Sequence, residues 1–308
     1  MRLWVISSDY QSDISISDNI LKQVAETYRK IRNTSRYILG NISDFDPNKD
    51  MVEYNELPEI DKWAIMKINE LVKTVTEGYD IYQFNKAYYG INSFLVHDMS
   101  TFYLDIIKDR LYVEGKTSKE RRAAQTAMYI ILSKLVRILA PITAFTAEEI
   151  WRYIPKKENE NTFSIMLEDY PKYDEKLYDK KLDDKFKKII EIKEIVSKKL
   201  EEAREEKLIG QTLEAKVTVI ANKENGLYQI IENNKNLIED VLIVSELELK
   251  EDNSKEKEEF SVNISRAEGE KCERCWKYTK DVGIDKENPT ICKRCSEVLR
   301  KYAKDYEI

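Results

Sequence analysis

The chain has 308 residues, of which 42% are hydrophobic and 35% charged. This composition indicates two or three folded domains and excludes an intrinsically disordered chain. The net charge of −6 excludes a positive field over the whole protein, so nucleic acid could bind only at local basic patches. No run of residues is apolar enough for a membrane helix and the N-terminus lacks a signal pattern, which together predict a cytoplasmic protein with no membrane partner.

The first half of the chain is predicted to be mostly helical. Its opening run, Met1 to Ile6, is expected to be a strand that needs a partner from a longer protein. From residue 18 onward, apolar residues recur at helical spacing. We expect helices over residues 18–44, 58–77, 81–96, 102–111, 119–139 and 147–153, the first capped by Ser17 or Asp18 and the last by Thr146. Few glycines and prolines interrupt them, which predicts a helical bundle with short connections.

The second half of the chain mixes helical and alternating patterns. We expect a charged helix over 182–207, a strand over 212–220, a helix over 227–234, a strand over 241–244, an acid-rich loop over 246–259 and a strand over 260–264. The fold class is therefore mainly α, with a small α+β unit near the C-terminal end. The expected domains are a tail at 1–17, a helical bundle at 18–155, a linker at 156–180, the α+β unit at 181–259 and a zinc-binding module at 260–308.

The four cysteines form the strongest motif in the sequence. Cys272 and Cys275 make one C-x-x-C pair, Cys292 and Cys295 make another, and sixteen residues separate the pairs. Two such turns can close a tetrahedron of thiolates around one Zn²⁺, with Zn–S distances near ~2.3 Å. Four protein ligands leave no open coordination position, so the zinc would be structural. Redox-active pairs or unbound thiols are the alternative, but neither pair clearly opens a helix after a buried strand.

Several stretches resemble bacterial-type isoleucyl-tRNA synthetases of class I. The resemblance lies in Leu3–Asp13, Ile20–Thr34, Phe102–Tyr112, Leu139–Trp151 and the Cys-Glu-Arg-Cys-Trp sequence that ends at Trp276. The bundle motifs are shared with the valine and leucine enzymes, whereas the cysteine-rich ending points to isoleucine. The resemblance implies an anticodon-binding bundle followed by a C-terminal zinc finger, with tRNA(Ile) as partner.

The resemblance also defines what the chain lacks. The catalytic signatures of the family, His-Ile-Gly-His and Lys-Met-Ser-Lys-Ser, are missing, and His97 is the only histidine. We expect His97 to be a structural residue at a helix end. The parent enzyme would bind ATP and isoleucine in a catalytic core outside this sequence, and would act as a monomer. The chain alone is predicted to have no catalytic residues and no activity.

Two groups of residues are predicted to contact tRNA. Arg29, Arg32 and Arg36 fall on one face of the first helix and could follow RNA phosphates. Arg274 and Trp276 flank Cys275 in a turn that a metal would fix, and an anticodon base could stack on either side chain. The alternatives are a solvated helix face for the arginines, and a role for Trp276 as the core of the zinc module. Trp151 is expected to be a core residue.

Three other functions remain open at this point. The chain could belong to a synthetase of the valine or leucine type. DNA glycosylases end in a similar four-cysteine finger, although they need an N-terminal catalytic amine and acid. A protein-binding zinc scaffold is the third alternative, and it would show no salt-dependent binding of tRNA.

Overall fold

The computed structural model describes residues 1–160, 163–254, 256 and 259–303. The chain divides into two units, each described here by itself. The first consists of Met1–Leu111 with Thr117–Asp179, and the second consists of Tyr112–Lys116 with the chain from Lys180 onward. Among the described residues, no helix has the length and apolarity needed to cross a bilayer. The finer division into five domains stays a prediction.

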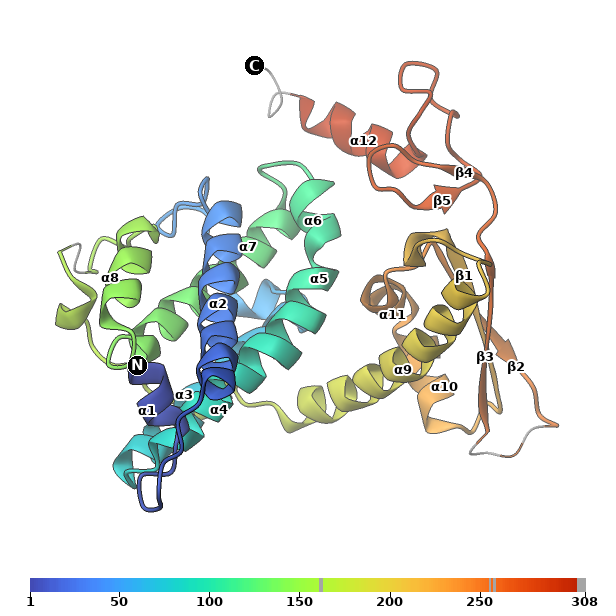
Figure 1. The fold of residues 1–308 in the computed structure, drawn as a ribbon. Coiled ribbons are helices and arrows are strands. Elements are labelled where there is room, and N and C mark those ends of the chain that lie inside the picture. The colour runs from blue at the N-terminus through green and yellow to red at the C-terminus, as the bar shows by residue number, and fades with distance from the viewer. Residues whose placement is uncertain (161–162, 255, 257–258, 304–308) are drawn as a thin grey trace. The chain divides into compact units, whose positions relative to one another are not determined.

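The first unit is a bundle of helices (Figure 1). In chain order its elements are α1 (Arg2–Ser7), α2 (Asp18–Asn41), η1 (Tyr54–Glu56), α3 (Glu59–Asp80), α4 (Phe84–Ser93), η2 (Phe94–Tyr103), α5 (Leu104–Ile106), α6 (Lys108–Tyr112), α7 (Lys119–Leu139), α8 (Ala144–Tyr153), η3 (Ile165–Leu167) and η4 (Glu175–Leu177). Helices α3 and α7 pack together and contribute a large part of the core, which includes the buried side chains of Trp63 and Tyr129. The expected helical bundle is therefore confirmed.

Helix α2 shows how the sequence pattern determines one face of this bundle. Val24, Ile31 and Ile38 are buried at helical spacing, so the opposite side of the helix faces solvent. The Ser17 hydroxyl accepts a hydrogen bond from the Ile20 amide at 3.3 Å, which confirms the predicted N-terminal cap. This geometry fixes which side chains of α2 can meet a partner.

Two local predictions for the first unit were wrong. The run Met1–Ile6 is not a strand but part of α1, in which the Val5 amide donates to the Met1 carbonyl at 3.0 Å. The segment therefore satisfies its own backbone and needs no partner strand. Helix α8 begins at Ala144, one turn before the predicted start, and Thr146 does not cap it. The Thr146 hydroxyl instead shares a hydrogen bond with the Tyr28 hydroxyl at 3.1 Å.

The stretch expected as the end of one helix and the start of the next is a continuous π-helix, η2. Its wider turn buries Phe94, Met99 and Tyr103 together, a spacing of four to five residues that an α-helix does not match. The Tyr103 hydroxyl donates to Asp61 at 2.7 Å, and Arg110 donates to both oxygens of the same buried carboxylate. These charge-assisted bonds join η2 and α6 to α3.

The second unit contains a three-stranded sheet and a small cysteine-rich module (Figure 1). Its elements are α9 (Lys180–Glu205), η5 (Thr212–Glu214), β1 (Ala215–Ala221), α10 (Gly226–Asn233), α11 (Lys235–Leu242), β2 (Glu246–Glu251), β3 (Phe260–Arg266), β4 (Glu270–Lys271), β5 (Tyr278–Thr279) and α12 (Lys293–Lys301). The order in the sheet is β2-β1-β3, with β1 parallel to β2 and antiparallel to β3. Alternate residues of β1 are buried, as the sequence predicted.

One strand of the sheet lies where a loop was predicted. Residues 241–244 are not a strand: Val241 and Leu242 end α11, and Ile243 follows in a left-handed conformation with φ of 54°. The strand β2 starts at Glu246, inside the acid-rich segment. Its charges are tolerated because Lys216 on β1 pairs with Glu246 at 2.7 Å and with Glu248 at 3.2 Å across the ladder. The strand expected over 260–264 is confirmed as β3, and its pairing with β1 makes it part of the sheet.

Candidate metal centre and nucleic-acid interface

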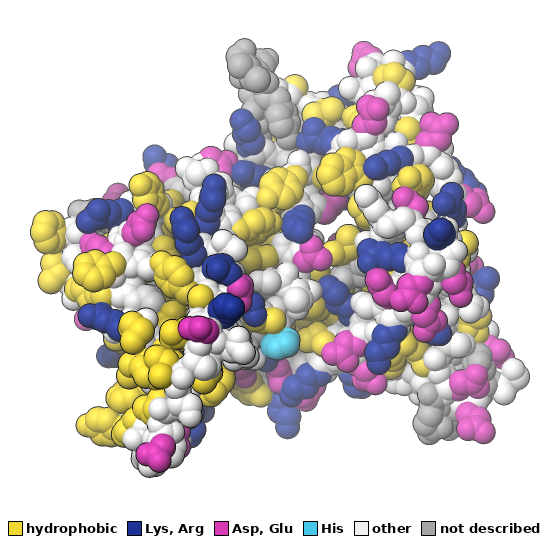
Figure 2. Space-filling view, viewed as in Figure 1, with side chains coloured by type: hydrophobic (Ala, Val, Ile, Leu, Met, Phe, Trp, Pro, Cys, Tyr) yellow, Lys and Arg dark blue, Asp and Glu magenta, His cyan; other side chains and the backbone are white. Residues whose placement is uncertain are grey.

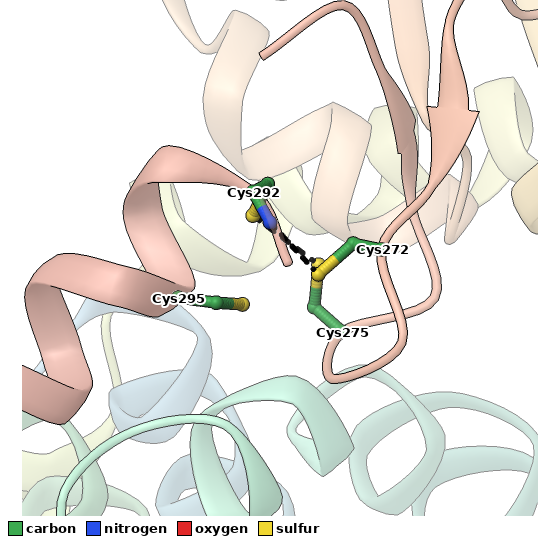
Figure 3. A group of neighbouring side chains, drawn as sticks. All are labelled: Cys272, Cys275, Cys292 and Cys295. Carbon is green, nitrogen blue, oxygen red and sulfur yellow. Dashed lines mark hydrogen bonds between the residues drawn. The ribbon is translucent and has the colours of Figure 1, made fainter. Parts of the chain in front are cut away.

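Four buried thiols converge at one point of the cysteine-rich module. The Sγ atoms of Cys272, Cys275, Cys292 and Cys295 all lie within 4.8 Å of one another. Figure 3 shows that the first two come from the turn after β4 and the other two from the start of α12, with their sulfurs directed toward each other. The sequence prediction that the two C-x-x-C pairs meet in space is therefore confirmed.

Backbone hydrogen bonds hold the first pair of thiols. The Cys272 amide donates to the Lys277 carbonyl at 2.9 Å, and the Trp276 amide donates back to the Cys272 carbonyl at 2.9 Å. These bonds close a tight turn between β4 and β5, whose strands pair antiparallel. The turn places both sulfurs on the same side of the backbone.

The start of α12 supplies the second pair. Cys292 is the N-cap residue of this helix, and Cys295 lies in its first turn. The amide of Cys292 also donates to the Cys272 sulfur at 3.2 Å, a bond drawn in Figure 3. The partial positive charge of the helix N-terminus therefore lies next to these two sulfurs.

Hydrogen bonding between the thiols makes the cluster electrostatically uneven. The Sγ atoms of Cys275 and Cys292 lie 3.8 Å apart. The hydrogen bond with Cys292 lowers the pKa of Cys275, and the same bond raises the pKa of Cys292 to about 11. Zn²⁺ binds thiolates, so a metal that enters the cluster must displace the remaining protons.

The donor set fits a structural zinc ion. A regular tetrahedron with Zn–S bonds of ~2.3 Å has edges of about 3.8 Å, and the Cys275–Cys292 separation equals this length. All four ligands would be protein sulfurs, which leaves no position for water or substrate. Lys271 and Arg274 lie beside the thiols in the sequence and could offset the charge of four thiolates.

The core around the thiols includes a residue from a distant part of the sequence. Val113 is buried against the four cysteines and Ile291, with Val282 and Leu299 at the edge of the cluster. The Arg274 guanidinium is half-buried and donates to the Val113 carbonyl at 2.6 Å. Sequence spacing could not reveal this contact, because 161 residues separate its two partners. Trp276 does not belong to this core cluster.

Trp276 is displayed on the surface by an unusual backbone conformation. Its φ is 64°, in the left-handed region that large side chains rarely adopt, and the residue is 56% exposed. The Lys271 ammonium lies 5.6 Å from the ring centroid, over one part of the indole. For a residue other than glycine the left-handed conformation costs roughly 1–2 kcal/mol. The cysteine turn therefore holds an exposed aromatic ring at an energetic cost.

The three arginines of α2 lie on its solvent-facing side. Arg29, Arg32 and Arg36 are all exposed. Arg29 pairs with Glu26 one turn earlier, whereas no carboxylate in the described part of the chain pairs with Arg32 or Arg36. The exposed Tyr28 ring lies on the same helix. The arrangement presents three exposed cations on one face of the helix, which can bind an anionic polymer.

The structure also gives the positions of Trp151, His97 and Glu148. Trp151 is fully buried, as predicted, and the cationic groups of Arg137 and Lys156 lie 4.7 and 4.1 Å from its ring centroid. His97 is not at a helix end: it lies inside η2 with an exposed side chain. Glu148 accepts hydrogen bonds from the Ser164 hydroxyl and the Ile165 amide, so it fastens a loop to α8.

Comparison with known proteins agrees with this geometry. Residues 61–219, just over half of the chain, match the anticodon-binding domain of tRNA ligases. The chain therefore belongs to that family. Residues 269–298, which contain all four cysteines, match the zinc finger found in FPG and IleRS. A structural zinc site is thus supported both by the cluster of thiols and by the family of this module.

Similar proteins extend over the whole chain. An isoleucine–tRNA ligase of Kosmotoga olearia is 50% identical over 309 residues, which cover 100% of this chain and 33% of the relative. The ligase of Caldicellulosiruptor saccharolyticus is 48% identical and covers 97% of the chain and 32% of its own length. That of Petrotoga mobilis is 47% identical, with 98% and 33% covered. The chain spans about a third of these relatives and matches their C-terminal part.

Proposed function

We propose that this chain reads the anticodon of tRNA(Ile) as part of an isoleucine–tRNA ligase. ATP and isoleucine would bind only in the catalytic part of that ligase, which this sequence does not contain, and the chain alone would be inactive. The protein is expected to act as a cytoplasmic monomer. Support comes from the family of the chain and from relatives that are isoleucine–tRNA ligases.

The exposed side chain of Trp276 is the main observation that supports anticodon recognition. An anticodon is a loop whose bases can leave the stack and pack on an aromatic side chain. A ring that serves only as a module core would be buried, yet this one is 56% exposed and lies outside the core cluster. The strained φ of 64° persists because hydrogen bonds of the cysteine turn fix the backbone on both sides. Such preorganisation lowers the entropy cost of stacking a base.

Arg274 is proposed to have a smaller role in RNA binding than Trp276. Its guanidinium has five N–H groups, and a terminal nitrogen donates to the Val113 carbonyl. Since the side chain is only half-buried, its exposed edge could still contact RNA next to the Trp276 ring. In this arrangement the hydrogen bond to the Val113 carbonyl would hold the Arg274 side chain in place while its exposed edge contacts RNA.

The arginine face of α2 is proposed to bind phosphates. Arg32 and Arg36 are exposed and have no carboxylate partner in the described residues, so binding RNA would not require breaking an ion pair. Arg29 must first release Glu26 and should contribute less. Contacts of this kind position RNA without reading its sequence.

The test is a comparison of cognate and non-cognate tRNA. Binding of residues 1–308 to tRNA(Ile), tRNA(Val) and tRNA(Leu) transcripts is measured at several salt concentrations. The proposal expects tighter binding of tRNA(Ile), with a difference that disappears when the anticodon of tRNA(Ile) is exchanged for that of tRNA(Val). A preference for tRNA(Val) or tRNA(Leu) would favour the related synthetases. Equal, salt-insensitive binding of all three would refute anticodon reading.

A further inference from the structure

The stretch that follows Trp276 is bonded to the sheet of the second unit. The Tyr278 amide, two residues after Trp276, donates a hydrogen bond to the Ser245 hydroxyl at 2.7 Å. Ser245 lies between α11 and β2, and its hydroxyl donates in turn to the carbonyl of Leu213 in η5. The Ser245 amide donates to the Ala215 carbonyl of β1 at 3.2 Å. One serine therefore joins β1, η5 and β5, which all belong to the second unit.

The Ser245 hydroxyl uses both kinds of hydrogen bond that it can make. A hydroxyl has one hydrogen to donate and lone pairs that accept. Here it accepts from the Tyr278 amide and donates to the Leu213 carbonyl. Alanine or valine at this position would remove both bonds, whereas threonine would keep the hydroxyl. Side-chain chemistry at residue 245 can therefore be changed without altering any residue of the cysteine turn.

The backbone on both sides of this bond is strained. Ile243, two residues before Ser245, has a φ of 54°, and Trp276, two residues before Tyr278, has a φ of 64°. The left-handed conformation is rare for β-branched and bulky residues, and it persists only where neighbouring bonds hold it. The Ile243 amide donates to the Glu239 carbonyl at 3.1 Å, which carries the chain from α11 toward Ser245.

An ion pair holds the same stretch against α11. The Lys277 ammonium lies 3.0 Å from the Glu239 carboxylate and 3.7 Å from that of Asp240. The side chains of Lys277 and Glu239 are only 21% and 25% exposed, so water and salt screen this pair less than a pair on the open surface. Trp276 therefore has the thiol of Cys275 on one side in the sequence and a residue bound to α11 on the other.

Charge is unlikely to orient RNA on this unit. Figure 2 shows Asp and Glu side chains intermixed with Lys and Arg over the second unit. The orientation of the Trp276 ring must then come from the backbone that bears it. We propose that Ser245 and Glu239 are positioning residues for anticodon reading: they hold the β4–β5 turn on the sheet, so that the Trp276 ring meets a base in one orientation. This inference rests on the proposed function, because it takes that ring to stack on an anticodon base.

A series of substitutions at Ser245 tests the hydrogen bond. Ser245→Ala and Ser245→Val should weaken binding of tRNA(Ile) roughly threefold to tenfold, because apparent affinity falls with the fraction of molecules in which the turn is correctly held. Their preference for the native anticodon over that of tRNA(Val) should fall, whereas the salt slope should not change, since the phosphate contacts are intact. Ser245→Thr should restore both affinity and preference. All three variants should retain zinc.

Two spectroscopic measurements distinguish lost positioning from lost fold. In Ser245→Ala the Tyr278 amide should exchange its hydrogen roughly tenfold faster or more, because it loses its acceptor. The Trp276 amide is bonded inside the turn to the Cys272 carbonyl at 2.9 Å and should stay protected. The fluorine resonance of 5-fluorotryptophan at Trp276, assigned with Trp276→Phe, should narrow as the ring gains mobility.

A substitution at Glu239 separates orientation from electrostatics. Loss of a negative charge would by itself strengthen RNA binding. The positioning role predicts the opposite sign: Glu239→Gln should weaken tRNA(Ile) binding roughly twofold to fivefold, because Lys277 loses its nearest partner on α11. Glu232→Gln removes an equal charge from an exposed residue of α10 and should not weaken binding.

The outcomes assign failure to one proposal or the other. Ser245→Ala that keeps zinc, loses protection of the Tyr278 amide and still prefers the native anticodon as the parent chain does would refute the positioning role. Tighter binding of tRNA(Ile) by Glu239→Gln would also refute it, and this comparison is decisive if Ser245→Ala loses zinc. If Trp276→Gly binds tRNA(Ile) normally, anticodon reading by the ring is wrong. In that case Tyr278 exchange and the fluorine signal still show whether Ser245 holds the turn.

Discussion

Replacing Trp276 by glycine would separate RNA stacking from the stability of the zinc module. Glycine adopts a φ of 64° without strain, so the substitution removes the ring and relieves the backbone at once. Alanine would remove the ring but keep the strain. We therefore expect Trp276→Gly to retain its metal and its thermal stability at least as well as Trp276→Ala does.

The same substitution should weaken tRNA binding. Loss of one base–aromatic stack costs roughly 1–3 kcal/mol. At ~1.4 kcal/mol per tenfold change, this corresponds to a loss of affinity of about 5- to 150-fold. Both Trp276→Gly and Trp276→Ala should show it, because both lack the ring. Ile284→Ala, at another exposed apolar residue of the module, should bind tRNA(Ile) normally.

The assay is tRNA(Ile) binding at fixed salt, with zinc content and circular dichroism measured on the same samples. Three results would contradict the reasoning. If Trp276→Gly keeps zinc and fold and binds tRNA(Ile) as tightly as the parent chain, the ring does not stack on RNA. If both variants lose zinc or melt far below the parent chain, the ring stabilises the module, and if Trp276→Gly melts far below Trp276→Ala, the left-handed conformation at this residue is not a source of strain.

Four further predictions concern metal, charge, pH and activity. Freshly purified protein should contain one zinc per chain, and Cys292→Ser should release it and expose the amides after Gly269 to hydrogen exchange, while β3 stays protected by its pairing with β1. Arg32→Ala should weaken all tRNAs alike and lower the salt slope by somewhat under one unit, with Arg29→Ala giving less. Burial opposes ionisation of Glu160, but hydrogen bonds from the Lys157 amide and Arg137 hold the pKa of its carboxyl below the usual value. The stability that this group contributes is therefore complete above its unfolded-state pKa and is lost as the pH falls through its folded-state pKa. Thermal unfolding of Glu160→Gln should accordingly depend less on pH in the acid range. Residues 1–308 alone should show no isoleucine-dependent pyrophosphate exchange, and robust exchange by protein free of other synthetases would reveal an unrecognised catalytic site.

Periodicity predicted the elements whose burial it reflects directly. Helix α2 and strand β1 each bury one regular face, and helix α7 buries more than one. The pattern of apolar residues was therefore sufficient to locate these elements in the sequence. The thiol cluster was also predictable, since tetrahedral coordination needs two close pairs and the spacing supplies them.

The sequence failed where a neighbour determined the structure. Strand β2 carries alternating acids whose pattern predicted a loop, and bonds from Lys216 and Thr218 on the adjacent strand make these acids compatible with a sheet. Tyr103 of the π-helix η2 and Arg110 of α6 both bond to Asp61 of α3, which lies more than forty residues earlier in the sequence. Val113 belongs to the thiol core, although 161 residues separate it from its hydrogen-bond partner Arg274 in the sequence. Such long-range contacts leave no signature in local spacing.

The position of Trp276 explains why this module needs a metal. In a segment of this size the largest apolar side chain would normally form the core, yet the core here consists of four thiols with Ile291 and Val113. Such a core is too small to offset the chain entropy lost on folding. Zinc coordination can supply the missing stability, because metal binding is coupled to folding of the ligands' turns. The same turns then hold Trp276 in a conformation that the residue would not adopt alone. Metal, backbone strain and exposed ring are thus parts of one arrangement: removal of zinc should abolish tRNA discrimination by the module through loss of the left-handed turn at Trp276, even in a variant such as Trp276→Phe that keeps an aromatic ring.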